Sequence, residues 1–171
     1  MRTLYLLRHA KSSSDDPELA DSERPLAPRG RDAIAAMADH MRAAGVAPDL
    51  VICSPAVRAR QTLKGLGDAI GSPPVDIEPR LYEANESDLL AVVRGVDDGI
   101  PSMMMIGHNP SIERLALLLA AESDLLDALR SKFPTAALAT LAADASGWRD
   151  LEPGRAQLEA FVRPRDLERA P

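Results

Sequence analysis

The sequence has a single cysteine, Cys53, and three histidines among its 171 residues. One cysteine excludes an internal disulfide framework and is typical of a reducing compartment, so we expect a cytoplasmic protein. With so few histidines and no second cysteine, a zinc site would also need carboxylates, and we expect no metal and no cofactor. The apolar stretches fall short of the about 18 residues of a membrane-spanning helix, and residues 3–7 are too few for a signal-peptide core. We therefore expect no membrane association.

Positive charge is also scarce. The chain has 20 Lys and Arg residues against 26 Asp and Glu residues, a formal net charge of -6. Proteins that bind nucleic acids or membrane surfaces in general need a basic face to neutralise phosphates. The composition therefore argues against a general nucleic-acid binder, so we expect no nucleic acid as a partner, and any site for an anion must be local.

The remaining composition is that of an ordinary globular protein. Hydrophobic residues make up 46% of the chain and charged residues 27%, which argues against disorder. A chain of this length suits one domain with a single core. We expect one domain at residues 1–163 and a C-terminal tail at residues 164–171.

Short apolar runs alternate with helical patterns along the chain. The expected strands cover residues 3–7, 49–53, 75–77, 102–106, 137–141 and 158–162, and the expected helices cover 31–44, 54–70, 86–96 and 112–121, with a polar loop at 10–29. Ser54-Pro55 and Asn109-Pro110 each place a capping residue before a proline, which predicts a helix start. The alternation predicts an α/β fold of three layers, with a mostly parallel central sheet and helices on both faces.

Basic and imidazole side chains follow three of the expected strands. Arg8 and His9 follow the first strand, Arg58 comes shortly after the second, and His108 follows the Met-rich strand at 102–106. The carboxyl ends of parallel strands meet at one edge of a sheet, where ligands bind. Two guanidinium groups beside helix N-termini would hold a phosphoryl group, and a neutral imidazole is a nucleophile near pH 7. The pattern predicts a phosphoryl-transfer site.

Four motifs resemble the signatures of the histidine phosphatase superfamily, in the same order. They are Leu7-Arg8-His9-Ala10, the stretch Ser54 to Thr62, Leu81-Tyr82-Glu83 and Gly107-His108-Asn109-Pro110. Arg24-Pro25-Leu26 with Arg29-Gly30, and Lys132 to Ala136, further resemble its small phosphohistidine phosphatase branch, the SixA type. The resemblance extends from Thr3 to Val162.

The resemblance implies a phosphoglycerate mutase-like fold and a role for each matching residue. His9 would be the phosphorylated nucleophile, Arg8 and Arg58 would bind the phosphoryl oxygens, and His108 would bind the phosphoryl group and stabilise the developing charge. Glu83 matches the proton donor of many members, although the small phosphohistidine branch does not always have a carboxylate there. The fixed cations would make a metal unnecessary.

The substrate class is suggested by the distance between two motifs. Glu83 and His108 are 25 positions apart, enough for one helix and one strand, whereas members that act on sugar phosphates usually insert a lid there. An open site favours a phosphohistidine presented by a protein over an enclosed metabolite. The alternatives are a phosphomonoesterase or mutase that acts on a small phosphorylated substrate, and a non-catalytic phosphate-binding module.

Overall fold

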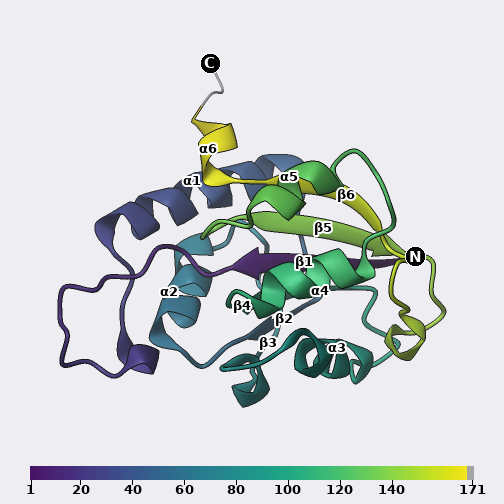
Figure 1. Cartoon of the computed structure of the whole chain (residues 1–171), viewed down its shortest axis with the longest axis horizontal. Coiled ribbons are helices and arrows are strands. Elements are labelled where there is room, and N and C mark those ends of the chain that lie inside the picture. The colour runs from purple at the N-terminus through teal and green to yellow at the C-terminus, as the bar shows by residue number, and fades with distance from the viewer. Residues whose placement is uncertain (169–171) are drawn as a thin grey trace.

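Within residues 1–168, which the computed structural model describes, the chain forms a six-stranded sheet in the order β3-β2-β4-β1-β5-β6 (Figure 1). The strands are β1 (Arg2–Arg8), β2 (Leu50–Cys53), β3 (Val75–Ile77), β4 (Ser102–Gly107), β5 (Leu138–Ala143) and β6 (Gln157–Val162). Neighbours from β3 to β1 pair in parallel, and β5 runs antiparallel to both β1 and β6. The expected mostly parallel sheet is confirmed, and all six expected strands are present.

Helices cover both faces of the sheet. They are α1 (Pro28–Ala44), α2 (Val57–Leu66), α3 (Glu86–Arg94), α4 (Ser111–Leu119), α5 (Leu126–Ser131) and α6 (Pro164–Leu167). Alternate residues of the central strands point to opposite faces: Leu6 and Met105 pack with α3, α4 and α5, while Leu7 and Met104 pack with α1 and α2. Strands covered on both sides read as continuous apolar runs, which explains the Met-rich segment of β4. The three-layer arrangement is confirmed.

The helix starts expected from the two proline motifs are wrong by one to three residues. The backbone N–H of Ser54 donates to the Ile106 carbonyl at 3.0 Å, so the chain stays extended past β2 and α2 begins only at Val57. α4 begins at Ser111, and Asn109 Oδ1 still accepts from the Glu113 N–H in its first turn at 3.3 Å. The freed Ser54 hydroxyl is thereby available to the site.

The expected C-terminal tail at residues 164–171 begins instead with α6. This short helix lies beside α1, and Leu167 packs against the core beneath α1. Arg163 and Asp166 hold its first turn, with Arg163 N–H donating to Asp166 Oδ2 at 2.9 Å. Residues 169–171 lie outside the described residues.

None of the helices within residues 1–168 has the length and apolar character that crossing a bilayer requires. The cytoplasmic location stays a prediction.

Candidate active site

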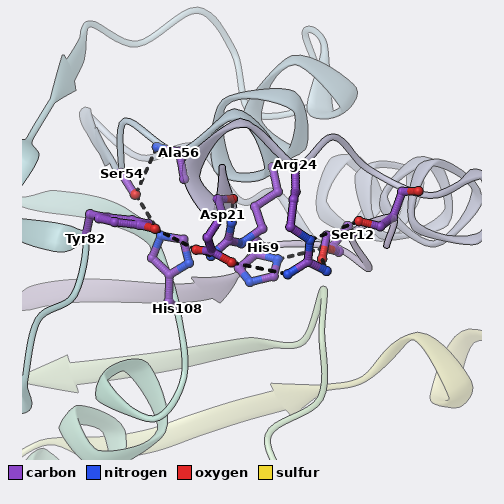
Figure 2. A network of polar contacts seen from close by, with 11 residues as sticks. His9, Ser12, Asp21, Arg24, Ser54, Ala56, Tyr82 and His108 are labelled. Atoms are coloured by element: carbon purple, nitrogen blue, oxygen red, sulfur yellow. Dashed lines mark hydrogen bonds and ion pairs between the residues drawn. The ribbon is translucent and has the colours of Figure 1, made fainter. Parts of the chain in front are cut away.

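The sheet register brings the ends of β1, β2 and β4 to one edge. Arg8 pairs with Gly107, and Cys53 pairs with Ile106, so the residues that follow these strands are neighbours. The rings of His9 and His108 lie 5.0 Å apart between their centres, and Figure 2 shows both beside the side chain of Asp21. The expected meeting of the two histidines at this edge is confirmed.

His9 is held in one orientation by the backbone. Its side chain is buried, with 7% of the residue exposed, and Nδ1 lies 2.7 Å from the Ala10 carbonyl oxygen. Because a carbonyl only accepts, Nδ1 carries the proton and the lone pair is on Nε2. Burial, together with the smaller effects of the His108, Arg58 and Arg8 charges, lowers the pKa of His9 to about 3, although the hydrogen bond to the Ala10 carbonyl acts in the opposite direction. His9 is therefore a neutral imidazole at pH 7, with a lone pair on Nε2.

His108 contacts the hydroxyl group that α2 leaves free. Its Nε2 lies 2.7 Å from Ser54 Oγ, which also accepts from the Ala56 N–H at 3.3 Å. The ring of Tyr82 meets the His108 ring edge-on at 5.6 Å. Burial and, to a smaller extent, the nearby charge of Arg58 lower the pKa of His108 to about 4. His108 is also neutral at pH 7.

Arg8 is anchored by the segment that precedes β5. Its Nη1 donates to the Phe133 carbonyl at 2.9 Å, and Asn109 Nδ2 donates to the same oxygen at 2.9 Å. The Phe133 N–H donates in turn to Glu113 Oε1 at 3.1 Å. Arg8 Nε and His108 Nδ1 are buried and have no hydrogen-bond partner among residues 1–168. The site thus holds two nitrogen atoms that lack partners, one of them an Arg8 N–H donor.

Arg58 forms an ion pair with Asp21, a residue that the sequence analysis did not assign to the site. Its Nη1 donates to the Asp21 carbonyl at 2.7 Å and its Nη2 donates to Asp21 Oδ2 at 3.0 Å. Tyr82 also donates to Asp21 Oδ2 at 2.6 Å, and Arg24 donates to Oδ1 at 3.2 Å (Figure 2). The Tyr82 and Arg58 hydrogen bonds lower the pKa of Asp21 to about 2. An ionised carboxylate therefore occupies the guanidinium fork of Arg58.

Glu83 lies apart from the other four predicted site residues, because its charge is not among those that shift the pKa of His9 or His108. It is exposed, has a left-handed backbone with a φ of 56°, and makes no hydrogen bond or ion pair with any residue in 1–168. Its neighbour Tyr82 reaches the site instead. A role for Glu83 stays a prediction.

Cys53, the last residue of β2, is fully buried. Burial raises the pKa of the Cys53 thiol to about 12, so no thiolate is present at pH 7. Within the described part of the chain, no group of three or more His, Cys, Asp or Glu side chains is arranged to hold a metal ion.

Comparisons with known proteins agree with this geometry. The model of the histidine phosphatase superfamily (branch 1) matches residues 4–90. An uncharacterized protein of Mycobacterium tuberculosis is 38% identical over 164 residues, which cover 93% of this chain and 100% of that protein.

Two solved structures are also similar. A protein of Nakamurella multipartitia assigned to the phosphohistidine phosphatase SixA superimposes with a TM-score of 0.83 at 32% identity, covering 95% of this chain and 96% of that one. The protein histidine phosphatase SixA complexed with tungstate gives a TM-score of 0.79 at 26% identity, covering 96% and 99%. The chain therefore belongs to the histidine phosphatase superfamily, in its SixA-type branch, and is a phosphatase.

Proposed function

We propose that this phosphatase removes phosphate from phosphohistidine in a protein, through a phosphohistidine intermediate on its own His9. The observation that carries the proposal is the orientation of His9, whose Nδ1 faces the Ala10 carbonyl and whose Nε2 is left unprotonated among Arg8, Arg58 and His108. A neutral, oriented imidazole beside fixed cations is what nucleophilic attack on phosphorus requires.

The reaction has two in-line steps. In the first, His9 Nε2 forms a bond to phosphorus as the bond to the substrate imidazole nitrogen breaks, and that nitrogen takes up a proton. In the second, water attacks phosphorus, loses a proton, and displaces His9 as inorganic phosphate forms. Positioning and charge stabilisation are the main tasks of such a site.

Arg8, Arg58 and His108 would hold the phosphoryl oxygens. Arg8 Nε is a buried donor with no hydrogen-bond partner in the described part of the chain, so a phosphoryl oxygen would satisfy it. At Arg58 the substrate would take the place of the Asp21 carboxylate, one oxyanion for another. Tungstate, bound in the similar SixA structure, is an oxyanion of the same shape as phosphate. We propose that these side chains do without a metal ion.

A protein substrate is supported by how little chain covers the site. The helix and strand between Glu83 and His108 are α3 and β4, and the short chain segments that join them are too short to form a lid. The Arg58 side chain is only 10% exposed, but the Asp21 side chain that occupies its fork is 54% exposed, so an oxyanion that replaced Asp21 would come from the solvent side. An open site suits a phosphoryl group on a surface better than a small metabolite.

The deciding experiment compares a phosphohistidine protein, a sugar phosphate and p-nitrophenyl phosphate, each with and without a chelator. We expect kcat/KM to be highest for the phosphohistidine protein and unchanged by the chelator. A faster sugar phosphate would instead favour a small-molecule phosphomonoesterase. Loss of activity with the chelator, and its return with one divalent ion, would contradict the metal-free mechanism.

The effect of replacing Glu83 should differ between the two substrate classes. An imidazole leaves phosphorus easily, so we expect Glu83→Gln to leave phosphohistidine hydrolysis unchanged, and to slow an alkyl phosphate by about 10² to 10⁴. The measurement is kcat/KM on both substrates, with Glu86→Gln as a control that removes the same charge. Equal large losses on both substrates would refute the leaving-group argument. If neither rate changes, Glu83 is not a proton donor.

Buried His9 and partly buried His108 should both stay neutral at pH values below the pKa of an ordinary histidine. Because burial lowers the folded-state pKa of His9 to about 3 and of His108 to about 4, we expect neither ring to protonate between about pH 7 and pH 5. The unfolded chain takes up these protons near pH 6.5, so stability should fall as the pH drops below that value. Histidine NMR signals, assigned with His9→Ala and His108→Ala, provide the measurement. A His9 signal that titrates near pH 6.5 would contradict the assignment.

A further inference from the structure

A hollow of about 600 Å³ lies between α1, α6 and the two segments that border the site. We call it the basic groove, and its lining includes Lys11, Arg29, Ala33, Thr135, Arg165 and Leu167. Its walls are closely packed: a side chain at Gly30 in α1 would collide with the Lys11 carbonyl, which also accepts from the Ala27 N–H at 2.9 Å. The groove is thus part of the fixed framework.

One end of the groove adjoins the nucleophile. Lys11 is two positions after His9, and Thr135 directly precedes Ala136, whose N–H donates to the His9 carbonyl at 3.1 Å. Both segments therefore run from the site into the groove. A chain whose phosphorylated residue reached His9 would have its neighbouring residues over the groove.

The groove is basic in a chain that is acidic as a whole. Its lining has four basic residues against two acidic ones, Asp32 and Glu168. Of the four, Arg163 is held by Asp166 at 2.9 Å. The other three, Lys11, Arg29 and Arg165, form no ion pair with any described residue, and all are exposed. Three like charges in one groove repel one another, so they do not stabilise the folded chain itself.

The chemistry of the lining favours a polypeptide as the occupant. Ala33 and Leu167 add apolar surface between the charges, and no aromatic side chain of the described residues lines the groove. Single-stranded nucleic acids generally need such aromatics for base stacking. A polypeptide with acidic and apolar side chains matches both the charges and the apolar surface.

We infer that the basic groove binds an acidic segment of the phosphorylated partner protein, next to its phosphohistidine. The inference rests on the proposed function for its substrate, a protein. The groove would then lower KM for partner proteins with an acidic segment, while the phosphoryl transfer takes place at Arg8, His9, Arg58 and His108.

The test uses two synthetic peptides with one phosphohistidine, flanked by Glu and Leu in the first and by Lys and Leu in the second. We expect the wild-type protein to favour the Glu/Leu peptide in kcat/KM by about tenfold at low salt, which two exposed ion pairs can supply, and to lose the preference at high salt. Arg29→Glu/Arg165→Glu should reverse the preference through KM. Hydrolysis of p-nitrophenyl phosphate should not change.

The control is Arg31→Glu/Lys64→Glu, which makes the same charge change at exposed residues outside the groove lining. It should keep the wild-type preference. Equal rates on the two peptides, or a preference that survives in the groove variant, would overturn the inference.

A binding measurement separates this inference from the proposed function. The unphosphorylated Glu/Leu peptide, with a fluorescent label, should bind the wild-type protein more tightly than the groove variant. If neither phosphopeptide is hydrolysed but this difference in binding is found, the proposed function is wrong, while the inference that the groove binds acidic segments is still supported. Equal binding to both proteins, or tighter binding of a single-stranded oligonucleotide, contradicts the groove.

Discussion

Replacing His9 with alanine should abolish turnover, with a fall in kcat of about 10⁴ or more, because in the proposed mechanism the covalent intermediate forms on this ring. Labelled substrate should leave label on the wild-type protein after an alkaline quench and none after an acid quench, since phosphohistidine is acid-labile. His9→Ala should hold no label under either condition. The measurement is single-turnover trapping combined with steady-state rates.

The control for this variant is His40→Ala, which removes a histidine in α1 and should keep full activity. His9→Asn, of similar shape, checks that the buried position has not simply lost its packing. Normal turnover in His9→Ala would show that the nucleophile is another residue, and an acid-stable label would point to Ser54, whose hydroxyl lies 2.7 Å from His108. Phosphate binding without turnover in the wild type would favour a non-catalytic module.

Replacing Arg58 with alanine should lower kcat/KM by about 10² to 10³, the usual loss when one fixed donor to a developing charge is removed. The variant loses the fork and also leaves the Asp21 carboxylate beside the site without its closest cation. That carboxylate would then repel the substrate. Asp21→Asn in the Arg58→Ala background should therefore recover part of the loss, which a double-mutant cycle measures.

Arg60→Ala is the matched control, because Arg60 is an exposed arginine of the same helix whose Nε donates only to the Pro55 carbonyl at 3.0 Å. Arg58→Lys keeps the charge without the fork and should fall between the wild type and Arg58→Ala. If Arg58→Ala loses no more activity than Arg60→Ala, Arg58 does not bind the phosphoryl group.

The sequence was sufficient to predict that Arg8, His9, Arg58 and His108 lie at the same edge of the sheet. Each follows a short buried run, and the rule that parallel strands end at one edge does not depend on knowing the loops. The same rule could not find Asp21. It lies in the polar stretch at residues 10–29, where no periodic pattern fixes the backbone, and it meets Arg58 across 37 positions. The length of that loop was itself a signal of function.

The helix ends were harder to predict than the strands. Ser54-Pro55 has the residue types of a helix start, but pairing with β4 keeps Ser54 extended and gives its hydroxyl to His108. Tertiary contacts outweighed the local preference. The short helices α5 and α6, of 6 and 4 residues, are too brief for a periodic signal, and α6 depends on packing against α1.

Unfolding of the two ends of the sheet can be followed separately, because the enzymatic rate reports on one end and a tryptophan reports on the other. Arg8 meets the Phe133 carbonyl across 125 positions, so catalysis depends on nearly the whole chain being in place. Trp148, the only tryptophan in the chain, lies at the opposite end of the sheet, where it is 1% exposed and donates to the Ile100 carbonyl at 2.7 Å. Fluorescence in a denaturant series follows that end, while enzymatic rate follows the other. Coincident curves would indicate cooperative unfolding, and any gap between them would measure how far the catalytic edge opens by itself.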